Sequence, residues 1–136
     1  MIRPFNVYGP GMQETDYRVL PNFANRIKAD LPLKVYGSGN QTRTFCYITD
    51  ALRGFLQALV KGLPGEAYNI GNPKPEISML ELVKISEGVL GRRVKHDVVE
   101  YQDSYPTDEP NRRCPDITKA RLQLGYEPKV TLEEGL

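Results

Sequence analysis

Apolar positions along the chain alternate between helical spacing and the short runs typical of strands. Helical spacing predicts four helices, which cover Leu20–Ala29, the segment between Asp50 and Gly62, the segment between Ser78 and Gly91, and the segment from Asp116 to Leu124. Strands are predicted at the N-terminus and at Leu33–Tyr36, Thr44–Ile48, Ala67–Ile70 and Val94–Val99. This alternation favours an α/β fold over a helical bundle or a β-sandwich.

Local signals add detail to these elements. The strands Leu33–Tyr36 and Thr44–Ile48 flank a Gly-Ser-Gly-Asn turn, which suggests a hairpin. Ser78 and Glu81 have the spacing of a capping box, and Asp50 and Asp116 are expected to cap the helices that follow them. The leucine-rich stripes of the helices, such as the stripe at Leu52, Phe55, Leu56 and Leu59, are expected to lie in the core. Residues 101–115 are expected to form an irregular loop.

The two ends of the sequence resemble the edges of an excerpt from a longer protein. The first residues predict the end of a buried strand that leads into the turn at Tyr8-Gly9-Pro10. Near the other end, Thr131 and Glu134 form a second capping box only a few residues before the last one. Because the first strand would have an open edge, we expect a homodimer or a self-associating fragment.

Composition and charge exclude several classes of function. The 136 residues include 18 basic and 17 acidic side chains, so a net charge of +1 gives no field that would attract nucleic acid or a membrane. The sequence contains no apolar run of membrane-spanning length and no signal peptide, and we therefore expect a cytoplasmic protein. Cys46 and Cys114 are expected to be reduced thiols, with Cys46 in the core, and His96 stands alone. No metal site is expected.

Three motifs point to a family. Arg3–Pro10, Gly37–Arg43 and Asn111–Asp116 together resemble the C-terminal part of the extended short-chain dehydrogenases/reductases that act on nucleotide-sugars. The resemblance runs nearly end to end. It implies that residues 1–136 are a small mixed α/β substrate-binding domain that carries a leftover strand of the doubly wound, dinucleotide-binding (Rossmann) sheet.

The same resemblance implies that the NAD-binding, N-terminal part is absent. No Gly-rich turn lies between a strand and a helix, and none of the tyrosines has a lysine four residues later. NAD is therefore the expected cofactor, bound mainly outside this chain, and the chain alone is expected to be inactive. The pair Pro4 and Phe5 would border the nicotinamide of a complete enzyme.

The resemblance also assigns substrate-binding residues. Asn6 would lie beside the sugar and phosphates, although it could instead stabilise the turn that follows it. Arg43 would grip the diphosphate with its planar guanidinium. Val35 and Tyr36 would line the base pocket, with core packing as the alternative for Tyr36, and Asn69 is a weaker candidate at a strand end.

The segment Arg112–Ala120 resembles that of UDP-glucuronate decarboxylases most closely. It aligns Arg113 with an arginine that reaches the substrate and could assist proton delivery. Apart from Arg113, no catalytic residue is expected in this chain. Cys114 replaces the usual lysine. Arg112 could be only a solvated loop charge.

The expected activity is NAD-dependent decarboxylation of UDP-glucuronate to UDP-xylose through a 4-keto intermediate. A dTDP-glucose 4,6-dehydratase and a UDP-sugar 4-epimerase remain as alternatives, so the partner is a UDP-sugar or a dTDP-sugar. A hypothesis of another class is a noncatalytic module that binds nucleotide-sugars or mediates oligomerisation.

Overall fold

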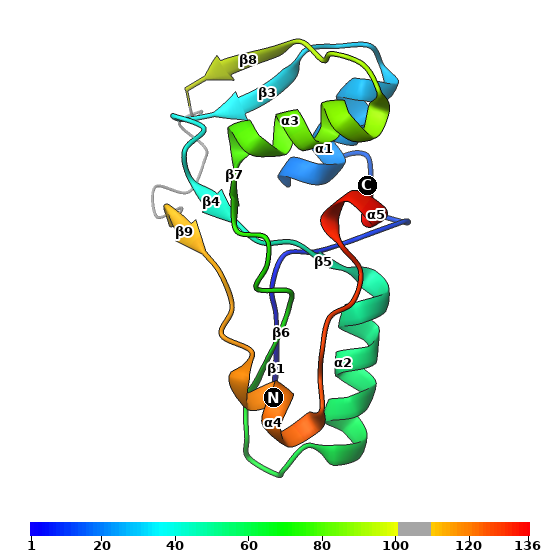
Figure 1. Cartoon of the computed structure of the whole chain (residues 1–136), viewed down its shortest axis with the longest axis vertical. Coiled ribbons are helices and arrows are strands. Elements are labelled where there is room, and N and C mark those ends of the chain that lie inside the picture. Colours follow the sequence, from blue (N-terminus) through cyan, green and yellow to red (C-terminus); the bar gives the residue numbers. More distant parts are fainter. Residues whose placement is uncertain (101–109) are drawn as a thin grey trace. The chain divides into compact units, whose positions relative to one another are not determined.

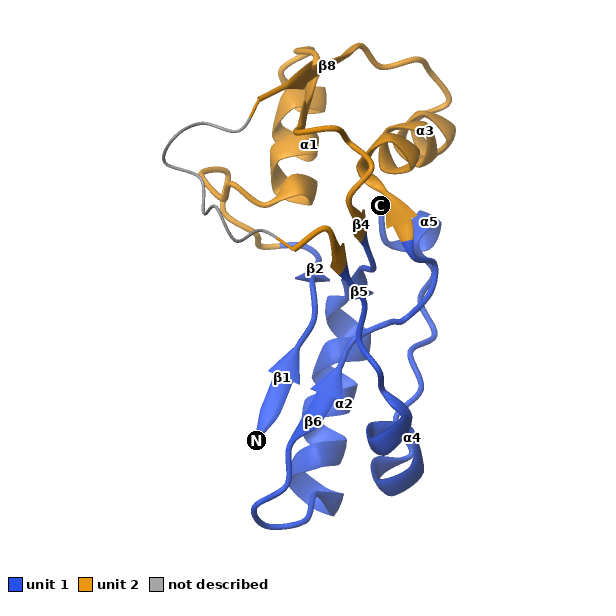
Figure 2. Ribbon diagram, turned by 90° about the vertical axis from the view of Figure 1, so that its left-hand side faces the viewer, with its two compact units in different colours: residues 1–10, 43–76, 113–136 blue, residues 11–42, 77–112 orange. Residues whose placement is uncertain are grey.

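The structure, a computed structural model, describes residues 1–100 and 110–136 of the chain. These residues form two compact units, shown in blue and orange in Figure 2. Unit 1 consists of residues 1–10, 43–76 and 113–136, and unit 2 consists of the remaining described residues of 11–42 and 77–112. Helices and short strands, labelled in Figure 1, occur in both units, which confirms the predicted mixed α/β class.

Unit 1 is built on parallel strand pairs covered by helices. Its elements are β1 (Ile2–Pro4), β2 (Val7–Tyr8), β5 (Cys46–Tyr47), α2 (Ile48–Lys61), β6 (Tyr68–Ile70), α4 (Thr118–Leu124) and α5 (Leu132–Gly135). β1 pairs with β6, with Arg3 opposite Asn69, and β2 pairs with β5. Parallel pairing is the pattern of a doubly wound sheet, as predicted for the N-terminal strand.

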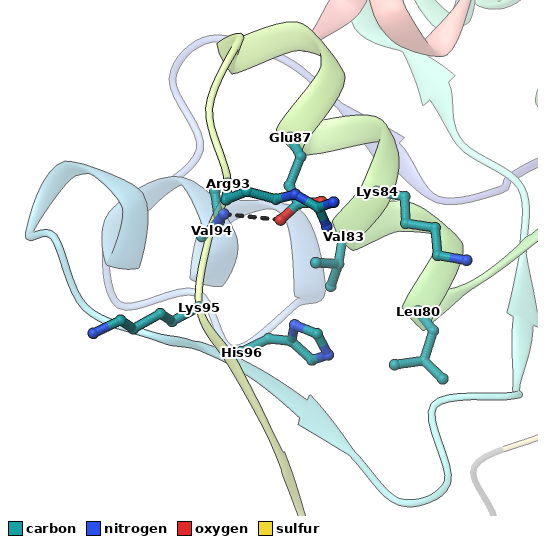
Figure 3. Close-up of a pocket in the computed structure, with 8 residues that line it drawn as sticks. All are labelled: Leu80, Val83, Lys84, Glu87, Arg93, Val94, Lys95 and His96. Atoms are coloured by element: carbon teal, nitrogen blue, oxygen red, sulfur yellow. Dashed lines mark hydrogen bonds and ion pairs between the residues drawn. The ribbon is translucent and has the colours of Figure 1, made fainter.

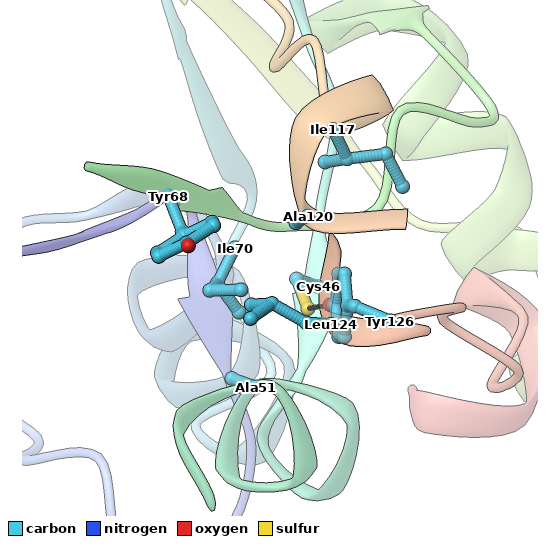
Figure 4. Close-up of a cluster of buried hydrophobic side chains, with 8 residues drawn as sticks. All are labelled: Cys46, Ala51, Tyr68, Ile70, Ile117, Ala120, Leu124 and Tyr126. Atoms are coloured by element: carbon cyan, nitrogen blue, oxygen red, sulfur yellow. Dashed lines mark hydrogen bonds between the residues drawn. The ribbon is translucent and has the colours of Figure 1, made fainter. Parts of the chain in front are cut away.

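The core of unit 1 lies between β5, β6 and the helices α2 and α4 (Figure 4). Eight buried residues form it, which are Cys46, Ala51, Tyr68, Ile70, Ile117, Ala120, Leu124 and Tyr126. The prediction that Cys46 is a core residue is confirmed. Full burial of a Leu or Ile side chain stabilises by about 1.5–3 kcal/mol, so Ile70, Ile117 and Leu124 contribute substantially to the stability of unit 1.

Unit 2 contains α1 (Val19–Lys28), β3 (Leu33–Tyr36), β7 (Ile77–Ser78), α3 (Met79–Leu90) and β8 (His96–Val99). β3 and β8 are parallel, with Leu33 opposite His96. The short strands β4 (Thr42–Arg43) and β9 (Arg112–Arg113) complete a sheet of order β7-β4-β9, and the division between the units falls within both of them. The loop expected over 101–115 therefore contains a strand, while residues 101–109 lie outside the described residues.

The predicted hairpin is wrong. β3 pairs with β8, and β5, the second half of the expected hairpin, pairs with β2. Both pairings are parallel and join residues far apart in sequence, so the turn between them does not set the register. Gly37 and Gly39 still have φ values of 65° and 73°, which explains why glycines occupy this turn.

The predicted core face of α2 is wrong for its three leucines, whereas Phe55 packs against the core as expected. Leu52, Leu56 and Leu59 are 50%, 62% and 81% exposed, whereas the buried face is formed by Asp50, Ala51 and Gly54. A β-carbon on Gly54 would lie 2.7 Å from Ile70 Cγ2, so the helix approaches the sheet on its smallest residues. The leucine stripe therefore lies on the opposite, exposed side of the helix.

The expected capping residues have mixed outcomes. The Ser78–Glu81 and Thr131–Glu134 capping boxes are both present. Asp50, in contrast, does not cap α2, because Tyr47 occupies the N-cap position. Asp116 precedes the N-cap residue Ile117 and accepts a hydrogen bond from the backbone N–H of Thr118 over 2.9 Å.

Candidate functional site

Thr44 connects the three principal site residues predicted from the sequence. The side-chain amide Nδ2 of Asn6 donates to the Thr44 carbonyl oxygen over 2.8 Å. The backbone N–H of Thr44 donates to the carbonyl oxygen of Arg113 over 3.3 Å, and Arg43 is the residue immediately before it. Asn6, Arg43 and Arg113 therefore come together through the backbone of one segment in unit 1.

Asn6 has a special backbone conformation. Its φ of 42° lies in the left-handed region, which asparagine tolerates better than most residues. Its carbonyl oxygen accepts a hydrogen bond from the Cys46 N–H over 3.1 Å. The amide thus joins the N-terminal segment to the segment around Thr44, instead of stabilising the turn at Tyr8-Gly9-Pro10.

The two arginines have different surroundings. Arg43 is only 7% exposed, whereas Arg113 is exposed. The hydroxyl of the neighbouring Thr44 is buried and has no hydrogen-bond partner among the described residues. A buried hydroxyl without a hydrogen-bond partner costs free energy and is therefore rare. Thr44 thus belongs to this cluster of candidate residues, although the sequence analysis did not predict it. Its position directly after Arg43 was the only available signal.

Phe5 lies where strand β1 meets the segment that follows Arg113. Its N–H donates to the Ile70 carbonyl oxygen over 2.9 Å, which continues the β1–β6 pairing by one residue. A β-carbon on Gly71 would lie 2.9 Å from Phe5 Cβ and 3.0 Å from Pro115 Cγ. Only glycine permits these chains to approach so closely, while Pro4 is exposed at the end of the strand.

Tyr126 supports this junction from the core and was also missed. Its hydroxyl donates to the carbonyl oxygen of Gly71 over 3.1 Å and lies 3.6 Å from Cys46 Sγ. Burial raises the pKa of Tyr126 well above its usual range, with the Cys46 contact adding to the shift, and burial likewise raises the pKa of the Cys46 thiol. Both groups stay protonated and serve packing.

The remaining predicted residues have structural partners. Asn69 donates from Nδ2 to the Asp116 carbonyl oxygen over 3.0 Å. In unit 2, Val35 is 1% exposed and belongs to the core, while the half-buried Tyr36 accepts a hydrogen bond at its carbonyl oxygen from Gln41 over 2.7 Å. Their roles toward a base or a sugar stay predictions.

Metal and NAD binding each require particular side chains or turns. No group of three His, Cys, Asp or Glu side chains suited to a metal occurs among residues 1–100 and 110–136. Within the same residues, no helix has the length and apolar character needed to cross a membrane. Gly37 and Gly39 lie between the strands β3 and β4, so they do not form the strand-to-helix turn that holds a dinucleotide pyrophosphate. The expectation that Pro4 and Phe5 border the nicotinamide stays a prediction.

Comparisons with known proteins agree with the motifs. The NAD dependent epimerase/dehydratase family matches residues 1–71. UDP-glucuronic acid decarboxylase 4 from Arabidopsis thaliana is 42% identical over 134 residues, which cover 98% of this chain and 29% of the relative. UDP-glucuronic acid decarboxylase 1 from Xenopus tropicalis is 41% identical, with 98% and 30% covered.

Solved structures of an epimerase and a dehydratase are also similar to this chain. UDP-glucuronic acid 4-epimerase from Bacillus cereus, in complex with UDP-glucuronic acid and NAD, superposes with a TM-score of 0.86 at 33% identity, over 98% of this chain and 41% of that one. The dTDP-glucose 4,6-dehydratase DesIV from Streptomyces venezuelae, with NAD bound, has a TM-score of 0.85 at 28% identity, over 98% and 40%.

The chain belongs to the NAD dependent epimerase/dehydratase family. Within that family, its curated relatives include the UDP-glucuronic acid decarboxylases, and it spans about a third of their length.

Proposed function

We propose that this chain is the C-terminal, substrate-binding part of an NAD-dependent enzyme that decarboxylates UDP-glucuronate to UDP-xylose through a 4-keto intermediate. In this proposal the redox step requires a nucleotide-binding part outside residues 1–136. Arg43 holds the diphosphate, and Arg113 balances the diphosphate or the hexuronate carboxylate. Asn6 contacts the sugar and phosphates, and Phe5 borders the nicotinamide.

The observation that carries the proposal is the convergence of Asn6, Arg43 and Arg113 on Thr44 in unit 1. An amide and two guanidinium groups together match the acceptor oxygens of a sugar linked to a diphosphate. The identity of about 41% to UDP-glucuronic acid decarboxylases over nearly the whole chain supports the choice of substrate.

Titration calorimetry of the 136-residue chain with UDP-glucuronate tests this proposal directly. Changing Arg43 and Arg113 together to Ala is expected to weaken binding by about 3 kcal/mol or more, because each charge-assisted hydrogen bond contributes about 1.5–3 kcal/mol. Arg112→Ala is the matched control in the same strand and should leave binding unchanged. Arg43→Lys, which keeps the charge but loses the bidentate fork, separates recognition from folding. Undiminished binding by the double variant would refute the site.

A UDP-glucuronate 4-epimerase is the second candidate, because the Bacillus cereus epimerase superposes over 98% of the chain. A chimera distinguishes the two reactions: this chain replaces the corresponding segment of a plant UDP-glucuronic acid decarboxylase, and the products are separated by chromatography. The decarboxylase proposal expects carbon dioxide and UDP-xylose. UDP-galacturonate without carbon dioxide would favour the epimerase, and the unaltered decarboxylase serves as the positive control.

A further inference from the structure

A pocket in unit 2 lies between helix α3 and the segment that leads into strand β8 (Figure 3). Its volume is about 520 Å³, which falls within the range of about 300–1,000 Å³ typical of small-molecule sites. Eight residues line it, which are Leu80, Val83, Lys84, Glu87, Arg93, Val94, Lys95 and His96.

The inner surface of this pocket is apolar. Val83 and Val94 are 2% and 8% exposed, and Leu80 is half-buried on the same helix. Leu80 and Val83 are three residues apart, which is nearly one helical turn, so they lie on the same face of α3. Such a surface favours the hydrocarbon part of a ligand over water.

The rim of the pocket is cationic. Lys84 projects from α3 and Arg93 from the facing segment, and the His96 ring extends from that segment toward α3 (Figure 3). Lys95 lies on the same segment, but its side chain points away from the others (Figure 3). Two permanent positive charges therefore flank the opening.

Glu87 is the acidic residue that lines the pocket. Its Oε1 accepts a hydrogen bond from the Val94 N–H over 2.9 Å, and its Oε2 lies 3.6 Å from Arg93 Nη1. The carboxylate therefore accepts a backbone hydrogen bond on one oxygen and forms a salt bridge with Arg93 through the other. The Arg93 side chain is 96% exposed, so it retains donors for a further anion.

We propose that this pocket binds a small organic anion, namely a carboxylate or phosphate monoester attached to a short apolar body. The hydrocarbon part contacts Leu80, Val83 and Val94, and the anionic group lies between Lys84 and Arg93. This site goes beyond the proposed function and does not rest on it.

Titration calorimetry of the full chain with octanoate and octyl phosphate tests this site. Saturable binding of either ligand supports the proposal, and a difference between the two identifies the preferred anion. Acetate, which lacks the apolar body, and octyltrimethylammonium, which has the opposite charge, should both bind at least tenfold more weakly. Binding of neither octyl anion, or equal binding of the octyl cation, would overturn the proposal.

Variants on the rim test the position of the charge. Changing Lys84 and Arg93 together to Glu is expected to weaken octanoate binding at least tenfold. Lys95→Glu changes the charge by two units, half the change of the double variant, on a side chain that points away, and it should alter the affinity less than about twofold. Equal effects of the two charge changes would show only general electrostatic attraction and would overturn the site.

Glu87→Gln gives a prediction of opposite sign. The amide oxygen of Gln can still accept from the Val94 N–H, while the negative charge that competes for Arg93 is lost. Octanoate affinity should therefore rise about threefold or more. Unchanged or weaker binding by a folded Glu87→Gln protein would contradict the proposed position of the anion.

Discussion

The side-chain amide of Asn6 donates a hydrogen bond of 2.8 Å to the carbonyl oxygen of Thr44, across 38 positions of sequence. This contact fixes the segment that carries Phe5 beside the segment that carries Arg43. We therefore expect the loss of this contact to lower the stability of the chain.

Asn6→Ala should destabilise the chain by about 2 kcal/mol, because it loses the amide hydrogen bond and leaves a β-carbon at a φ of 42°. Asn6→Gly loses the same bond without the backbone strain, so its cost should be about 1 kcal/mol. Denaturant unfolding measures both. A glycine variant less stable than the alanine variant would contradict the proposed contribution of the left-handed backbone.

Asp50 should be important for stability although it does not cap its helix. It is 2% exposed, and its Oδ2 accepts hydrogen bonds from the N–H groups of Lys129 and Val130 over 2.7 and 2.8 Å. Asp50→Asn should therefore cost about 3 kcal/mol in the free energy of unfolding. Asp30→Asn, at an exposed ion pair with Arg92, is the control and should change it by less than about 0.5 kcal/mol. Equal effects would show that the Asp50 hydrogen bonds are dispensable.

Two helical glycines should respond in opposite directions to alanine. A β-carbon on Gly54 would meet Ile70 and the Tyr126 ring at 2.7 and 2.8 Å, whereas nothing lies within 4 Å of a β-carbon on Gly88. Gly54→Ala should destabilise by about 1–3 kcal/mol, and Gly88→Ala should stabilise by about 0.5–1 kcal/mol. Thermal unfolding of both proteins measures the difference. A stabilised Gly54→Ala protein would mean that α2 does not approach β6 so closely.

The capping box of α3 predicts a pH dependence. Hydrogen bonds from the backbone N–H and then the hydroxyl of Ser78 hold the pKa of Glu81 below its usual value of 4.5. The carboxylate therefore stabilises the folded state above that value, and this contribution is lost as the pH falls through the lowered pKa. The stability of the wild type relative to Glu81→Gln should be greatest near neutral pH and decline below about pH 4.5. A constant difference over this range would refute the assignment.

The elements specified by neighbouring residues were predictable from the sequence. The helices α1 and α3 and both capping boxes follow from spacing over a few residues. The hairpin failed because β3 and β5 each pair with a distant strand, a choice made by tertiary packing and not by the turn between them. Tertiary packing also decides which face of α2 is buried. The small residues Ala51 and Gly54 allow close contact with the sheet and with Tyr126, while the leucines remain exposed.

The site was predictable only in part. Motif resemblance pointed to Asn6, Arg43 and Arg113, and their common contact with Thr44 is a property of the fold. Thr44 carries no sequence signal of its own, because a threonine next to an arginine in a strand has many ordinary explanations. The contribution of Tyr126 depends on its reach to the Gly71 carbonyl, across 55 positions of the chain.

The division of the chain has a practical consequence for protein engineering. The polypeptide passes between unit 1 and unit 2 after residues 10, 42, 76 and 112. Neither unit is one continuous stretch, so no simple truncation yields either of them in isolation. A stand-alone version of unit 1 would need two designed linkers, one that joins residue 10 to residue 43 and one that joins residue 76 to residue 113.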